Sequence, residues 1–387
     1  MESSAKIFSE IITEFSYKGK SKASLCNMTF FLGAGFSKSW DDRFPVGNQL
    51  FTLKFDDWER KSQFLESYLR THGYDVLEDI TPSRFKEIIY QLGMYKKYPE
   101  IRPRYIDDGN IHMVESELRA LVLDRFKTIA PLYYYNEGTQ KIDFGHDLND
   151  AQRSIVDLFY ILMRESDGSQ GVSEGLRTHI LTTNYDFIPE AILDSILAPD
   201  DSFLLYTYRG VTPYSICGNE NPVAVHDNWL VNSLFKINGG FEVFQKNGQF
   251  EFDYRNHDFE HFRANPPQIM LPSNEQDYTQ DYFKALFPKS IRLLQESRVL
   301  VVVGYSLPEE DALIRFLMKQ FAEDRADGDN KIIFYIDISS DEEQISKISS
   351  VFPHSDEQRG LTVVPFSGGF GEWVKTVLDI HLTKQSR

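Results

Sequence analysis

Residues 29–40 read TFFLGAGFSKSW, an apolar run that leads into a glycine-containing turn. A strand, a tight glycine turn and a helix N-terminus form, in that order, a common phosphate-binding unit. Gly33 and Gly35 permit close backbone approaches that a side chain would block, and Ser37 either caps the following helix or donates to a phosphate oxygen. The dinucleotide fingerprint has a third glycine where this chain has Lys38. The turn alone therefore favours nucleotide binding and a purely structural turn equally.

The composition predicts a soluble, cytoplasmic protein with a substantial core. The 387 residues are 41% hydrophobic and 14% aromatic, enough for two domains or for one large domain with an insertion. The net charge of −17 disfavours a general nucleic-acid surface, so no direct nucleic-acid binding is expected. The N-terminal residues lack the apolar core of a signal peptide, and the most apolar run, 299–303, is too short to span a membrane.

No metal site is expected from the cysteines and histidines. The two cysteines, Cys26 and Cys217, cannot form a zinc site of four thiolates. His257 and His261 stand four residues apart and would share a helix face, but the segment NHDFEHF lacks the HExxH pattern of zinc proteases.

Short apolar and β-branched runs predict a parallel sheet with buried strands. The six runs are residues 28–32, 179–183, 233–237, 299–303, 331–338 and 361–365. Helical patterns follow most of them, which predicts an α/β, Rossmann-like fold with helices on both faces of the sheet. The interval 55–175 is rich in helical patterns and too long for a loop, so it is predicted to be an inserted helical subdomain. Residues 1–54 and 176–387 then form the sheet domain.

A polar motif, TTNYD, follows the predicted strand 179–183. Asn184 offers a donor and an acceptor, and Asp186 adds an acceptor. In an open α/β sheet, ligands bind outside the carboxyl ends of the strands, which is where these side chains would lie. Alternatively, Thr183 or Asn184 only caps the next helix, and the motif taken alone favours that cap.

Two more strand ends carry candidate binding residues. Gly304 and Ser306 follow the strand 299–303 in the motif GYSL, and Asp337 ends the strand 331–338. A carboxylate at the position of Asp337 suits either a ribose hydroxyl or a turn. Because the carboxyl ends of parallel strands share one edge, a single crevice would gather all of these motifs. Their joint occurrence is more specific than any one of them.

Taken together, GAGFS, the Pro-Val-Gly of 45–47, TTNYD, KING and GYSL resemble the SIR2 superfamily. The chain is most similar to the zinc-free SIR2-like NADase domains of bacterial antiphage defence. The resemblance covers roughly residues 20–55 and 176–387 and leaves out the helical insertion. Sirtuin deacetylases carry a zinc ribbon of four cysteines that this chain cannot make. The resemblance therefore implies NAD as a substrate, without zinc, rather than protein deacylation.

The resemblance also assigns roles to residues of the crevice. It implies that Asn184 orients a water or binds the ribose next to nicotinamide, and that Asp186 helps to seat the nicotinamide end. Asn238 stands at the third catalytic position. Pyrophosphate and adenosine contacts would come from the binding residues Gly33, Ala34, Gly35, Ser37, Thr183, Gly304, Ser306 and Asp337.

One position departs from the family. The family has a histidine in a Lys-Leu-His-Gly segment as the general base toward a ribose hydroxyl, whereas residues 236–240 here read KINGG. Asn238 cannot accept a proton near neutral pH. Three explanations compete: the enzyme manages with Asn184 and a positioned water, the position has been substituted to trap the substrate, or the protein binds NAD without cleaving it. His226, in AVHDNW, either substitutes as the base or is an ordinary loop histidine.

Two functions follow from the resemblance. The first is an NAD hydrolase that depletes cellular NAD during infection, as a homo-oligomer and beside a partner such as a HerA-type ATPase. The chain itself has no GxxxxGK[ST] motif, so any ATP would be used by another polypeptide. The second is a non-catalytic NAD or ADP-ribose sensor that scaffolds a defence complex, and Asn238 is the feature that favours it.

Overall fold

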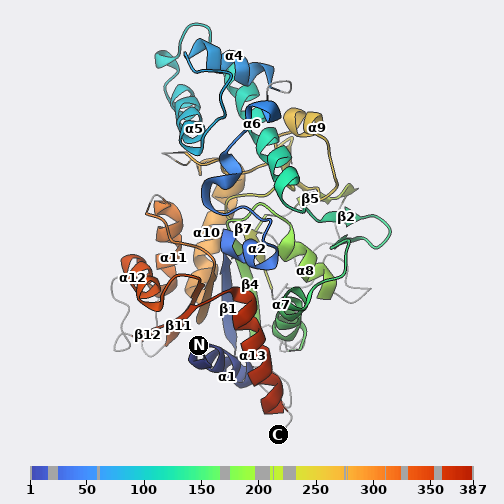
Figure 1. Ribbon diagram of the computed structural model, residues 1–387, viewed down its shortest axis with the longest axis vertical. Coiled ribbons are helices and arrows are strands. Elements are labelled where there is room, and N and C mark those ends of the chain that lie inside the picture. Colours follow the sequence, from blue (N-terminus) through green and yellow to red (C-terminus); the bar gives the residue numbers. More distant parts are fainter. Residues whose placement is uncertain are drawn as a thin grey trace.

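The chain folds around a central sheet with a helical extension at one end (Figure 1). The computed structural model describes residues 2–15, 25–58, 62–165, 175–196, 210–211, 213–220, 232–273, 276, 278–309, 311–323, 330–352 and 360–385. Within these ranges, no helix is both long and apolar enough to cross a membrane.

All six predicted strands are present, and every pairing between them is parallel. They are β1 (Cys26–Leu32), β4 (Leu176–Thr182), β7 (Leu234–Lys236), β10 (Val299–Val303), β11 (Lys331–Asp337) and β12 (Leu361–Ser367). The order across the sheet is β12-β11-β10-β1-β4-β7. The chain thus adds β4 and β7 on one side of β1 and then returns to add the other three strands on the opposite side. This confirms a Rossmann-like α/β fold and puts the topological switch point between β1 and β10.

Helices cover both faces of the sheet, as predicted. On one face lie α1 (Glu2–Phe15), α7 (Asp150–Tyr160) and α13 (Phe370–Gln385), with α8 (Ile188–Ile196) beside α7. Phe30 of β1 fixes this layer, because its ring lies 6.3 Å from Phe8 of α1 and 5.2 Å from Phe159 of α7. The other face carries α10 (Asp281–Glu296), α11 (Ala312–Glu323) and α12 (Asp341–Val351).

The interval 55–175 contains the predicted helices. They are α3 (Phe55–Trp58), α4 (Gln63–Thr71), α5 (Pro82–Lys97) and α6 (Asp108–Ile129), of which α4, α5 and α6 extend away from the sheet in Figure 1. A hairpin of β2 (Tyr134–Asn136) and β3 (Lys141–Asp143) follows, and then α7, which packs against α13 on the sheet, and a short π-helical turn, Ile161–Glu165. The division of the chain into two domains remains a prediction.

A second, smaller sheet was not predicted from the sequence. It contains β5 (Pro213–Ile216), β6 (Asn219–Glu220), β8 (Val243–Lys246) and β9 (Gln249–Phe252) in the order β6-β5-β9-β8. The helix that follows it, α9 (Phe259–Ala264), packs against α6. The segment between β7 and α10 thus leaves the central sheet and contacts the helical insertion.

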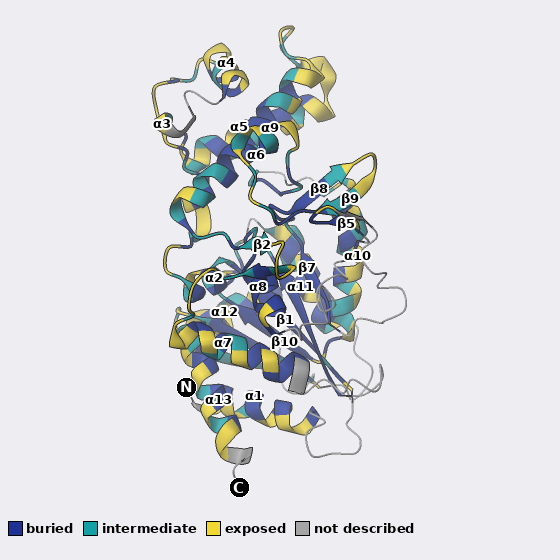
Figure 2. Cartoon of the chain, turned by 90° about the vertical axis from the view of Figure 1, so that its right-hand side faces the viewer, coloured by how far each residue is buried: buried dark blue, intermediate teal, exposed yellow. Residues whose placement is uncertain are grey.

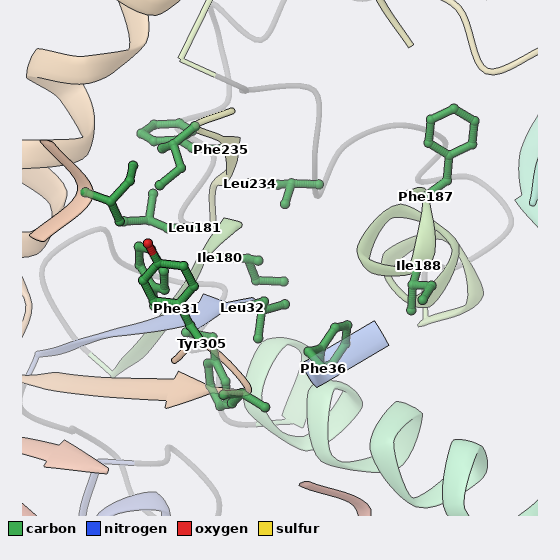
Figure 3. Close-up of a cluster of buried hydrophobic side chains, with 14 of the residues drawn as sticks. Phe31, Leu32, Phe36, Ile180, Leu181, Phe187, Ile188, Leu234, Phe235 and Tyr305 are labelled. Carbon is green, nitrogen blue, oxygen red and sulfur yellow. The ribbon is translucent and has the colours of Figure 1, made fainter. Parts of the chain in front are cut away.

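The buried interior runs through the sheet and up to the edge where its strands end. Figure 2 shows buried positions along the strands and exposed positions on the outer sides of the helices. Below the carboxyl ends of β1, β4 and β7, apolar side chains of these strands gather with those that begin α8 (Figure 3). Among them, the Phe31 ring lies 5.1 Å from that of Tyr305, which follows β10. This packed cluster forms the base on which the loops at that edge rest.

Candidate functional site

A cavity of about 680 Å³ opens at the carboxyl ends of the strands. Its wall includes residues after β1, β4, β7, β10 and β11, residues of the short 3₁₀ helix η1 (Gly47–Phe51), and residues of α5 and α6. The volume is typical of small-molecule sites. The predicted site residues that line it are Ala34, Gly35, Ser37, Thr183, Asn184, Asp186, Asn238, Gly304, Ser306 and Asp337. The remaining one, Gly33, accepts a hydrogen bond from a wall residue through its carbonyl oxygen.

Three glycines allow the loops after β1 and β10 to touch at the switch point. The Gly35 N–H donates to the Gly304 carbonyl over 2.8 Å. A Cβ on Gly35 would lie 2.6 Å from the Gly304 Cα, and one on Gly33 would lie 2.6 Å from the Gly304 carbonyl oxygen. Gly304 itself has a φ of +58°, a conformation that favours glycine. The glycines are therefore required by loop-to-loop contact, whatever ligand the loops hold.

The structure corrects the expected role of Ser37. Helix α2 (Ala34–Trp40) begins at Ala34, so Gly33 and not Ser37 occupies the N-cap. Ser37 is buried within the helix, and its hydroxyl donates to Asp186 Oδ2 over 2.6 Å. The prediction that Ser37 caps the helix is wrong because the helix starts earlier than expected.

The expected cap of α8 is also at a different residue. The amide of Ile188, the first residue of α8, donates to Asp186 Oδ1 over 3.0 Å. Thr183 and Asn184 do not cap this helix. Thr183 donates its N–H to the Leu32 carbonyl, and Asn184 turns toward the loop after β1. The local alternative for TTNYD is therefore wrong for both residues, and Asp186 fills that role.

Asn184 begins a chain of hydrogen bonds that ends at Asp186. Its Nδ2 donates to the Gly33 carbonyl and to Ser37 Oγ, each over 2.8 Å, and Ser37 donates onward to Asp186. Because a carbonyl only accepts, the amide nitrogen must face Gly33, which fixes the orientation of the Asn184 amide. Its Oδ1 has no partner within the described ranges and remains available to a ligand or a water.

Asp186 is a buried carboxylate with three kinds of neighbour. Burial raises the pKa of Asp186 above its ordinary value, while the Ser37 hydrogen bond, the charge of Lys236 and the Ile188 amide act in the opposite direction. Its two oxygens accept hydrogen bonds from Ser37 and from the Ile188 amide, and such donated bonds stabilise the ionised form of a carboxylate.

A buried ion triad lies directly behind this loop. Lys236 Nζ lies 2.9 Å from Glu190 Oε1 of α8 and 2.9 Å from Glu242 Oε2, and all three side chains are 0% exposed. The same ammonium donates to the carbonyl of Tyr185, which lies between Asn184 and Asp186 in the chain, over 3.4 Å. Lys236 thereby links the end of β7 to α8 and to the TTNYD loop.

The KINGG segment is explained residue by residue. Gly239 has a φ of +76°, and a Cβ there would lie 1.7 Å from the Gln268 carbonyl oxygen. A Cβ on Gly240 would lie 2.1 Å from Glu242 Oε2, so this glycine leaves room for the carboxylate of the triad. Asn238 accepts a hydrogen bond from the Met270 N–H through its main-chain oxygen, over 2.8 Å. Its Oδ1 is buried and has no partner within the described part of the chain.

The loops after β10 and β11 form the opposite side of the cavity. Tyr305 donates to Asp311 Oδ2 over 2.6 Å, and Tyr335 donates to the Tyr305 carbonyl over 2.7 Å. Burial raises the pKa of Tyr305, which keeps this donor protonated. Asp337 accepts from the Ser339 N–H over 2.9 Å, so its turn role is confirmed, and it also faces the cavity.

Some wall residues could not be found from the sequence. Lys86 of α5 and Phe126 of α6 belong to the helical insertion, where no motif marked them. His226 lies outside the described residues. Among those described, no group of three or more His, Cys, Asp or Glu side chains could hold a metal ion.

No protein-family model matches the chain, and a comparison with curated proteins finds no match either.

Proposed function

We propose that the protein is an NAD hydrolase that cleaves the bond between nicotinamide and ribose. The observation that carries the proposal is the chain of hydrogen bonds from Asn184 through Ser37 to Asp186, in the wall of a cavity at the switch point. Switch-point crevices are where Rossmann-like folds bind nucleotides. The resemblance to zinc-free SIR2-like domains supports NAD as the nucleotide and antiphage defence as the setting, with assembly or an ATPase partner as the control.

The reaction needs few protein groups. The bond between the ribose carbon and the nicotinamide nitrogen breaks, and its electron pair neutralises the pyridinium ring. A water oxygen then bonds to the cation-like ribose carbon and releases one proton, as in glycoside hydrolysis. In this proposal Asn184 Oδ1 accepts a hydrogen bond from that water. The carboxylate of Asp186 keeps Asn184 oriented through Ser37 and favours positive charge nearby.

A product assay tests the proposal. Purified protein, alone and with the product of its genomic neighbour, is incubated with NAD, and nicotinamide and ADP-ribose are measured. We expect both products in equal amounts. If NAD binds but neither the protein alone nor its mixture with the neighbouring gene product releases nicotinamide, the hydrolase proposal is wrong. The second candidate, an NAD or ADP-ribose sensor, then replaces it. The buried, unpartnered Oδ1 of Asn238 is the observation that favours the sensor.

Restoring the family's histidine should raise the rate. With Asn238→His, an imidazole that titrates near neutral pH would stand in the cavity wall, and general base catalysis is typically worth about 10²–10⁴-fold. We therefore expect faster release of nicotinamide at saturating NAD, with a new dependence on pH near neutrality. Asn238→Gln, which adds bulk without a base, is the matched control. An equal rate for both variants would show that proton abstraction does not limit cleavage.

A further inference from the structure

We infer that Lys86, in the helical insertion, binds the diphosphate of the nucleotide, an inference that rests on the proposed function. Lys86 lies on α5 and lines the cavity, and its ammonium makes no hydrogen bond or ion pair with the described part of the chain. The insertion would then be part of the binding site and not only an attachment to the sheet domain.

The charges of the wall require a cation for a dianionic ligand. Three carboxylates line the cavity, those of Asp186, Asp311 and Asp337, and each would repel a diphosphate. The described wall has two ammonium groups, Lys38 and Lys86. Lys38 already donates to the Asp42 carbonyl. This bond to a neutral carbonyl leaves Lys38 its charge and two further donors, whereas Lys86 is the wall ammonium that makes no bond at all within the described residues.

The loop after β1 has few amides left for phosphate. The N–H of Gly33 donates to the Val303 carbonyl over 2.9 Å, and that of Gly35 to the Gly304 carbonyl over 2.8 Å. The N–H of Phe36 donates to the Gly33 carbonyl over 3.0 Å. Rossmann-like sites usually neutralise the pyrophosphate with backbone amides of this turn. With these three amides committed, the turn offers fewer donors to a diphosphate, which leaves a larger share of its binding to other groups of the wall.

The position of Lys86 is fixed by its neighbour. Phe85 is fully buried, and its ring lies 5.3 Å from that of Phe51 in η1, another segment of the wall. This contact holds α5 against the cavity, so the side chain of Lys86 starts from a packed helix and not from a free loop. A lysine of this kind acts as a point charge for phosphate oxygens.

Binding measurements on the full chain test the assignment. The probes are ADP-ribose and adenosine. ADP-ribose carries the diphosphate but lacks the nicotinamide and so has no bond for the enzyme to cleave, and adenosine has no phosphate. For Lys86→Ala we expect ADP-ribose to bind about tenfold to a hundredfold more weakly, the usual effect of losing a charged hydrogen bond, and adenosine to bind as before. The salt dependence of ADP-ribose binding should fall. Lys86→Arg should retain most of the affinity.

The control is Lys97→Ala, which removes an exposed lysine of the same helix outside the cavity wall and should change neither affinity. Thermal unfolding checks that both alanine variants fold. Equal ADP-ribose affinities of the wild type and Lys86→Ala would overturn the assignment and leave the proposed function standing. An equal loss of adenosine binding would also overturn it, because the lysine would then support the cavity generally. Failure of the wild type to bind ADP-ribose or NAD would overturn the proposed function and the assignment together.

Discussion

Lys236→Met should destabilise the fold by about 3–5 kcal/mol, the usual cost of removing one partner of a buried ion pair. The substitution leaves the carboxylates of Glu190 and Glu242 fully buried, without the ammonium that lies 2.9 Å from each. The Tyr185 carbonyl also loses a donor. Methionine is close to lysine in volume, so the loss would reflect charge and hydrogen bonding more than a cavity. Urea unfolding, followed by intrinsic fluorescence, measures the change.

A compensated variant separates this explanation from simple packing. Lys236→Met combined with Glu190→Gln and Glu242→Gln removes all three charges and keeps the side-chain sizes. We expect it to recover at least half of the lost stability, since neutral amides are far less costly to bury than carboxylates that have lost a neighbouring ammonium. If the triple variant is no more stable than Lys236→Met, the charges are not what makes Lys236 necessary.

The triad also bears on how far this site can be predicted from sequence. Strand runs, helix periodicity and polar residues at strand ends are local signals, and they predict the sheet and most of the site residues. Ten of the eleven predicted site residues line the cavity, and one of these ten, Asn238, was predicted only from the resemblance to a family. Lys236 appears in the same motif as Asn238, yet its role depends on Glu190 and Glu242, which meet it only in the fold. No spacing rule marks such a contact.

The glycines illustrate a second limit. The sequence predicts a close approach at Gly33 and Gly35, and in the structure the atoms that come close are those of Gly304 and Tyr305. The sequence indicates that close approach is required, and the strand order decides what approaches. The prediction of helix ends is limited for a related reason. Serine is a common cap residue, but α2 begins at Ala34, so Ser37 lies inside the helix. Lys86 had no local signal at all, because its position in the wall comes from the packing of α5 against η1.

Asn184→Ala should lower NAD cleavage by about 10²–10³-fold, which is the usual effect of removing one positioned polar group from an active site. The change removes the amide oxygen proposed to hold the attacking water. It also removes the two donated hydrogen bonds, to the Gly33 carbonyl and to Ser37. Water in the adjoining cavity can replace those donors, so we expect the variant to fold and to bind ADP-ribose within a few-fold of the wild type. Initial rates of nicotinamide release give the result, and an unchanged rate would contradict the site assignment.

Ser37→Ala and the double variant distinguish a connected chain of hydrogen bonds from independent contacts. Among the described residues, Ser37 is the one side chain that links the Asn184 amide to the Asp186 carboxylate, accepting over 2.8 Å and donating over 2.6 Å. If Asp186 acts by orienting Asn184, Ser37→Ala lowers the rate, and adding it to Asn184→Ala lowers the rate little further, since the group being oriented is already gone. If the two losses multiply, Ser37 and Asp186 act on the substrate by a separate route. Asp186→Asn should then be as damaging in the Asn184→Ala background as it is alone.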